Sequence, residues 1–123
     1  MAGKHTVEKI GGTSMSRFGE VMENVIIGGR SGADLYNRGF VVSAYGGITN
    51  LLLENKKTGA PGIYGTFASE EGDWVAELEC TRGRMLEHNR SFADIGLDVD
   101  IANAFVNERM DGILDCLRDI MRL

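Results

Sequence analysis

The first half of the chain alternates between short apolar runs and a stretch with helical periodicity. Residues 5–10 combine β-branched side chains with an abrupt stop at a Gly-Gly pair, which is typical of a strand. Apolar side chains then recur at helical spacing over residues 14–27, a second Gly-Gly pair follows, and residues 30–37 read as a polar loop. Residues 38–43 form a near-continuous apolar run, as in a strand that is covered on both faces. Strand, helix and strand in this order predict a right-handed βαβ unit with two parallel strands.

Helical periodicity dominates the second half. Residues 48–57 predict the start of another helix, and residues 58–62 predict a turn. One long helix is expected over residues 66–92, and a second begins near Asp98 or Asp100, either of which can cap its N-terminus. We therefore expect a helical hairpin in the C-terminal third. The apolar positions that should line its two helices are Phe67, Trp74, Leu78, Met85 and Phe92 in the first and Ile101, Phe105, Ile113, Leu117 and Ile120 in the second.

Composition narrows the class of protein. A chain of 123 residues with 43% hydrophobic and 25% charged residues is long enough for one domain with a modest core. Most of the glycines lie before residue 73, which favours a loop-rich α/β part over residues 1–65 and a helical part over residues 66–123. The net charge of −5, without a basic stripe, argues against nucleic-acid binding, and the apolar runs are too short to cross a membrane.

The cysteines and the first residues bear on the cellular compartment. Cys80 and Cys116 are widely separated and lack metal-ligand spacing, so we expect reduced, buried thiols and no structural zinc site. The N-terminus carries no apolar signal core. Together these features predict a cytoplasmic protein.

The junction after the first predicted strand reads Lys9-Ile10-Gly11-Gly12-Thr13-Ser14. Paired glycines at a strand-to-helix junction expose backbone N–H groups to which an anion can come close, and the helix dipole adds to the attraction. Lys9 adds a full positive charge, so the sequence predicts a phosphate cradle. It matches neither G-x-x-x-x-G-K-S/T nor G-x-G-x-x-G. The alternative is a plain strand–turn–helix with a solvent-exposed lysine.

The junction after the second predicted strand repeats this arrangement. Residues 43–50 read S-A-Y-G-G-I-T-N, with a hydroxyl on each side of a Gly-Gly pair. In open parallel sheets, ligands bind outside the carboxyl ends of the strands, where both loops would lie. We therefore expect one site with two compartments. Thr49 has an alternative interpretation, as the N-cap of the following helix.

The two junctions resemble the signatures of a known enzyme family. The first is similar to K-F/Y-G-G-T-S, which opens the aspartokinases of the amino-acid kinase superfamily, with Ile10 in place of the aromatic residue. The second is similar to the family's S-A-x-x-G-x-T-N/D-x-L. The variant I-G-G-T-S-M resembles aspartokinases associated with ectoine synthesis. The ordered pair of motifs, at a suitable spacing, carries the resemblance.

The resemblance implies a fold, a reaction and a set of site residues. The fold would be part of the parallel-sheet αβα sandwich of amino-acid kinases. The reaction would transfer the γ-phosphoryl group of ATP, bound with Mg²⁺, to the β-carboxylate of L-aspartate and give 4-phospho-L-aspartate. A carboxylate nucleophile needs no base at neutral pH, so the site's task is positioning and charge neutralisation. The resemblance assigns the ATP phosphates to Lys9, Gly11 and Gly12, with Lys9 as the catalytic residue, and aspartate to Thr13, Ser14, Ser43, Gly47 and Thr49.

The resemblance also limits what this chain can do alone. Aspartokinases continue with H-G-E and R-G-G-S-D segments that do not occur here. We therefore expect the chain to be the amino-terminal part of the catalytic domain, inactive by itself, in an enzyme that forms a homo-oligomer. Two alternatives stay open: another amino-acid kinase, of the acetylglutamate or glutamate kinase type, and a non-catalytic anion-binding or interaction module.

Overall fold

A computed structural model describes residues 4–123, which divide into two compact units at Gly46 and Gly47. The first unit, up to Gly46, is an α/β element with a two-stranded sheet. The second unit, from Gly47 onward, is helical. Within residues 4–123 no helix combines the length and apolarity needed to cross a membrane.

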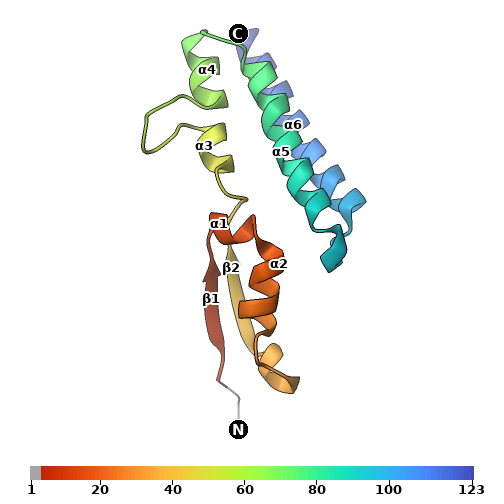
Figure 1. The fold of residues 1–123 in the computed structure, drawn as a ribbon. Coiled ribbons are helices and arrows are strands. Elements are labelled where there is room, and N and C mark those ends of the chain that lie inside the picture. The colour runs from red at the N-terminus through yellow and green to blue at the C-terminus, as the bar shows by residue number, and fades with distance from the viewer. Residues whose placement is uncertain (1–3) are drawn as a thin grey trace. The chain divides into compact units, whose positions relative to one another are not determined.

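The sheet of the first unit pairs the two predicted strands. Strand β1 (Thr6–Ile10) lies parallel to β2 (Arg38–Val42) (Figure 1), with Thr6 opposite Arg38 and Ile10 opposite Val42. The buried side chain of Ile10 ends β1 and forms part of the core. The parallel pairing that the order strand, helix, strand predicted is confirmed.

The connection between the strands differs from the single helix predicted over residues 14–27. It consists of α1 (Gly12–Met15), α2 (Phe18–Val21) and the π-helical segment η1 (Met22–Ile27). The break falls at Arg17, whose φ of −118° and ψ of 38° are not helical. Just before it, the amide and the hydroxyl of Ser16 both bond to the Gly12 carbonyl, a side-chain bond that bends helices.

The end of this helical segment agrees with the sequence. Gly28 has φ +51°, a conformation that glycine adopts without strain, and it terminates η1 where the second Gly-Gly pair predicted an end. The following polar loop contains a short 3-10 helix, η2 (Gly32–Leu35).

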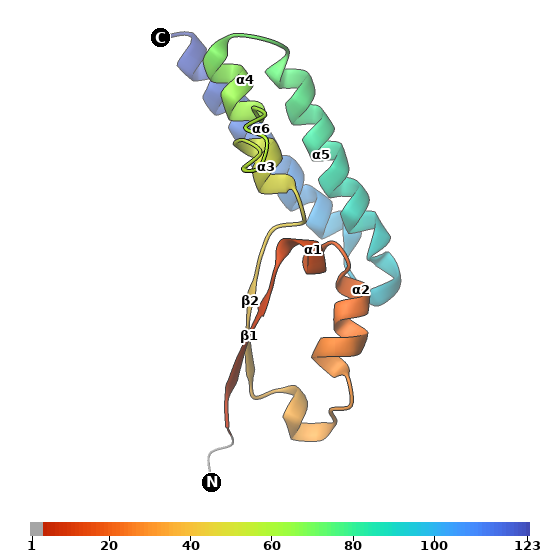
Figure 2. The same ribbon diagram turned by 60° about the vertical axis from the view of Figure 1, so that its left-hand side comes forward.

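The prediction that the second strand is covered on both faces is wrong. Val41 is 56% exposed, and its same-face neighbour Val7 is 78% exposed. The opposite face contacts η1: the Arg38 side chain on that face donates hydrogen bonds to the carbonyls of Val25 and Ile26. Within residues 4–46, Figure 2 shows the helical segment on one side of the strand pair only. The apolar run is the sequence of a strand buried on both faces, but this unit supplies a single covering layer, which also leaves Phe40 and Val42 on its own side exposed.

A buried ion pair ties the strands to this layer. Arg38, whose side chain is 3% exposed, donates through Nε and Nη2 to the two carboxylate oxygens of Glu8, at 2.7 Å each. Arg30 adds a second cation 3.5 Å from the same carboxylate. Hydrogen bonding from Arg38 lowers the pKa of Glu8, and the bond to Glu8 raises the pKa of Arg38.

We expect the stability of the first unit to fall as the pH drops below the ordinary carboxyl pKa of 4.5. The pKa of Glu8 is lower in the folded chain than in the unfolded chain, so the unfolded chain takes up the proton first as the pH falls. The stabilisation is therefore complete above pH 4.5 and is lost as the pH falls through the lower pKa of the folded chain. Urea unfolding followed on the β1 amide signals by NMR, between about pH 3 and pH 7, measures this dependence. The Glu8→Gln variant should be less stable at neutral pH and should lack this part of the acid response. Equal pH dependence in both proteins would contradict the assignment to Glu8.

The second unit is built around a helical hairpin. Helices α5 (Trp74–Ser91) and α6 (Val99–Met121) lie side by side in Figures 1 and 2, joined through the 3-10 helix η3 (Ala93–Ile95). Two shorter helices, α3 (Ile48–Leu52) and α4 (Ile63–Ser69), precede them. The hairpin confirms the prediction for the C-terminal third. The core of the second unit consists of the buried residues Ile63 of α4, Leu78 of α5, and Val106 and Met110 of α6.

Two predicted helices of this unit are shorter than expected. The helix predicted over residues 48–57 ends at Leu52, because the Asn55 side chain accepts two backbone N–H groups and forms a turn. The helix predicted over residues 66–92 is broken at Glu70 and Gly72, which both have positive φ. Asp73 then caps α5 through the N–H of Ala76.

The predicted start of α6 is correct, but its predicted apolar stripe is partly wrong. Asp98 caps the helix by accepting the N–H of Ile101 at 3.1 Å. Ile101 and Phe105 themselves are exposed, while Val106 and Met110 are buried. The face of α6 that packs against α5 is turned by about one residue from the expected stripe. This observed face still includes Ile113 and Leu117.

Candidate functional site

The first unit brings the two glycine loops together at the carboxyl end of its sheet. The N–H of Ser43 donates to the carbonyl of Ile10 at 3.1 Å, which continues the strand pairing into both loops. A Cβ on Gly12 would lie 3.3 Å from the Ala44 oxygen, and one on Gly46 would lie 3.3 Å from the Gly12 oxygen. These two glycines therefore allow the backbones of the loops to touch.

Gly11 has no such packing role. Its φ of −76° and ψ of 171° are extended values that any residue adopts. A Cβ at this position would meet no atom of the described chain within 4 Å. Neither conformation nor packing requires glycine here, and the space beside the Gly11 backbone is open.

Three successive backbone donors follow Gly11. In the described chain the N–H groups of Gly12, Thr13 and Ser14 have no acceptor, whereas the next one, of Met15, donates to the Gly11 carbonyl at 2.9 Å. The side chains of Thr13 and Ser14 are exposed, which leaves their hydroxyls accessible. Because α1 has only four residues, the long helix dipole expected at this point is absent, and any attraction for an anion comes from these amides and from Lys9.

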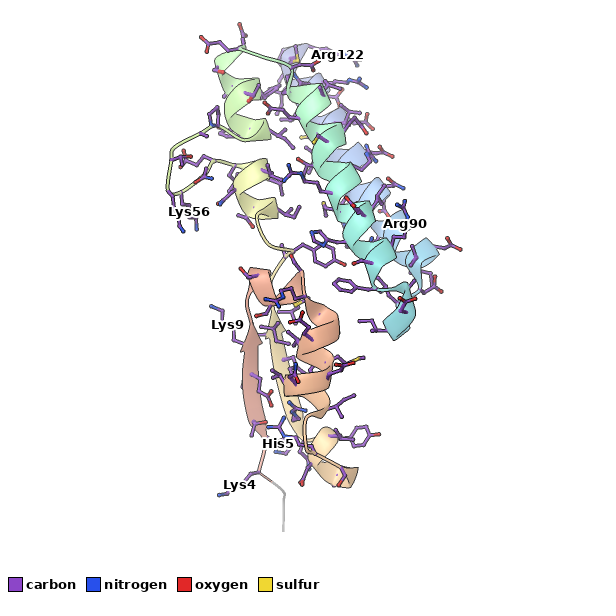
Figure 3. The ribbon with its side chains drawn as sticks, in the orientation of Figure 1. Lys4, His5, Lys9, Lys56, Arg90 and Arg122 are labelled. Carbon is purple, nitrogen blue, oxygen red and sulfur yellow. The ribbon has the colours of Figure 1, made fainter. Side chains whose placement is uncertain are left out.

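Lys9 lies on β1 opposite Val41. Strand alternation places it on the uncovered sheet face, and Figure 3 shows its side chain projecting outward from the strand. Among residues 4–123 its ammonium has no carboxylate partner. The structure thus provides an uncompensated positive charge two residues before Gly11.

Ser16 joins the two loops and was missed by the sequence analysis. Its Oγ accepts the N–H of Gly46 at 2.7 Å and donates to the Gly12 carbonyl at 3.3 Å. The sequence holds no local signal for this role, because Gly46 is 30 residues away.

The second glycine loop continues into the second unit. Gly47 has φ +81°, which favours glycine, and it is the N-cap of α3 without a side-chain cap bond. Thr49 is therefore the second residue of α3, exposed, and not the N-cap that the alternative interpretation required. In the first unit, Ser43 is exposed, and burial raises the pKa of the half-buried Tyr45 phenol.

Cys80 and Cys116 are both exposed, so the prediction of buried thiols is wrong. Within residues 4–123 no three His, Cys, Asp or Glu side chains are grouped so that they could hold a metal ion. The donors around the glycine loops are amides, hydroxyls and one ammonium.

The chain is similar to a protein that is named as an aspartate kinase. No family model matches the chain, and no solved structure matches it significantly. Over 121 residues the chain is 54% identical to the aspartate kinase Ask_Ect of Stutzerimonas stutzeri (strain A1501), a match that covers 97% of this chain and 25% of the kinase. The chain thus spans about a quarter of the length of this curated relative. The similarity supports an aspartate kinase origin for this chain.

Proposed function

We propose that this chain is the amino-terminal part of an aspartate kinase catalytic domain of the amino-acid kinase type, inactive by itself. The complete enzyme transfers the γ-phosphoryl group of ATP to the β-carboxylate of L-aspartate and gives 4-phospho-L-aspartate. The similarity to a named aspartate kinase and the ordered pair of glycine motifs support this proposal. We infer a homo-oligomeric, cytoplasmic enzyme whose partners are its small substrates, and not nucleic acid or a membrane.

The environment of Gly11 carries the proposal of a phosphate site. A glycine that neither its φ nor its packing requires is explained when a ligand approaches the backbone at that point. The unpaired N–H groups of Gly12, Thr13 and Ser14 begin at the next residue and can donate hydrogen bonds to the oxygens of a phosphate. Lys9 adds the charge that a polyphosphate needs.

Each loop then has its own task. The first loop holds the ATP phosphates, and the second loop holds aspartate next to them. The N–H of Gly46 is already bonded to Ser16, so it is not an aspartate donor. The residues assigned to ATP are Lys9, Gly11 and Gly12, and those assigned to aspartate are Thr13, Ser14, Ser43, Gly47 and Thr49.

The chemistry of this donor set fits phosphoryl transfer to a carboxylate. The nucleophile is ionised at neutral pH, so no general base is required, and the residues position charges and neutralise them. Mg²⁺ bound with ATP supplies further neutralisation of the phosphate charge. The donors around the two loops offer no carboxylate cluster for the ion, so we assign it no ligand from the described residues.

Substitution of Gly11 tests the phosphate site. We expect Gly11→Ala to keep or slightly raise the melting temperature, since alanine restricts the unfolded chain and meets no atom in the fold. It should weaken the binding of tripolyphosphate to the chain about tenfold, because the methyl group occupies the space that the anion needs. NMR titration of the amide signals measures the affinity.

Gly29→Ala is the matched control, because a Cβ there also meets nothing within 4 Å and the residue is remote in sequence from both loops. It should leave the affinity unchanged. Equal tripolyphosphate affinity in wild type and Gly11→Ala, or no binding by the wild type, would contradict the phosphate site.

A further inference from the structure

Ser16 lies outside both glycine motifs, yet it contacts both loops. Its hydroxyl oxygen accepts the N–H of Gly46, and its hydroxyl proton is directed to the carbonyl of Gly12. Its own N–H donates to the same carbonyl at 3.1 Å. One side chain therefore bridges backbone groups of two loops that are far apart in sequence.

The bridge is short and leaves little room for a side chain on Gly46. The distance of 2.7 Å between the Gly46 nitrogen and the Ser16 oxygen is at the short end of the range for such bonds. A Cβ on Gly46 would lie 3.2 Å from the same oxygen, so only glycine allows this approach without a shift of the loop. Because Gly12 and Gly46 are in backbone contact as well, a displacement of the first loop is passed to the second.

We propose that Ser16 is a positioning residue that fixes the second loop against the first and couples the second loop to anion binding at the first. The coupling rests on the proposed function, since it assigns a polyphosphate to the amides beginning at Gly12. An anion drawn to these amides acts on the peptide whose carbonyl holds Ser16, and Ser16 passes the shift to Gly46. The position of the second loop, which is proposed to bind aspartate, therefore depends on whether a polyphosphate is bound at the first loop.

A purely local role is the competing interpretation. Ser16 also ends α1, and its bond to Gly12 bends the helical segment whatever happens at Gly46. A local role affects the turn around residues 12–17 and leaves the Gly46 amide alone. Hydrogen exchange at Gly46 therefore separates the two interpretations without any ligand.

The experiment compares Ser16→Ala with Ser16→Thr in the 123-residue chain by ¹⁵N NMR. Loss of the hydroxyl should speed hydrogen exchange of the Gly46 amide about tenfold, as expected for one net hydrogen bond, and threonine should restore the protection. The amide of Ser43, bonded to Ile10, is the internal reference and should not change. Ser31→Ala, which removes an exposed hydroxyl that caps no backbone N–H, is the control variant.

Titration with tripolyphosphate tests the coupling. In the wild type the signals of Gly12 and Gly46 should both shift, and in Ser16→Ala only the Gly12 signal should shift. Unchanged Gly46 exchange in Ser16→Ala, or an equal Gly46 shift in both proteins, would overturn the proposal. If the wild type binds no tripolyphosphate, the proposed function fails and the coupling with it, while lost Gly46 protection would still support the fixing role. If Ser16→Ala does not fold, Ser16→Cys replaces it, because a thiol forms weaker hydrogen bonds than a hydroxyl. The proposal then predicts that the Gly46 amide exchanges faster in Ser16→Cys than in the wild type, and an unchanged rate would overturn it.

Discussion

Replacement of Lys9 by alanine is expected to lower kcat by about 10²–10³-fold in a complete aspartate kinase that carries this chain. Lys9 supplies a full positive charge two residues before the first glycine loop, and within residues 4–123 no carboxylate neutralises it. Charge develops on the phosphoryl group during transfer, so the loss of a preorganised cation raises the barrier. Lys9→Arg should rescue only in part, because the planar guanidinium differs in shape and reach from an ammonium.

A chimera provides the assay for this prediction. In it, the present chain replaces the matching segment of the Stutzerimonas aspartate kinase, and aspartyl phosphate is trapped as its hydroxamate. Lys4→Ala is the matched control, an exposed lysine just before the same strand, and it should leave kcat unchanged. A Lys9→Ala rate within about twofold of the unsubstituted chimera would show that Lys9 is only a surface charge.

Thr49→Val is expected to raise the KM for aspartate about ten- to a hundredfold in the same chimera, with little change in the KM for ATP. The substitution keeps the shape of the side chain and removes one hydrogen bond to a charged group, worth about 1.5–3 kcal/mol. Because Gly47 and not Thr49 caps α3, the hydroxyl has no capping role, and the melting temperature should stay the same.

Three measurements interpret the Thr49→Val result. A raised KM for ATP alone would mean that the two loops are assigned the wrong way round. A lower melting temperature with both KM values unchanged would indicate a structural role.

Assay of the unsubstituted chimera with glutamate and acetylglutamate as acceptors tests the alternative kinases, and a preference for either would overturn aspartate as the substrate.

The sequence alone determined those features that depend on neighbouring residues. The strands β1 and β2, their parallel pairing and the helical hairpin follow from short-range periodicity and from turn residues. The cap at Asp98 and the stop at Gly28 follow from the chemistry of single positions. The two glycine motifs and the resemblance that they carry were likewise visible without any coordinates.

The tertiary structure decided what depends on partners distant in the chain. The break after Ser16 and its bridge to Gly46 arise because a hydroxyl finds a backbone group 30 residues away, which no periodicity records. The exposed Val41 and the turned face of α6 depend on which layers pack against them, and an apolar pattern shows that a face can be buried but not what buries it. The distinction between Gly11 and Gly12 belongs here too, since only the position of the second loop shows that one glycine is needed for packing and the other is not.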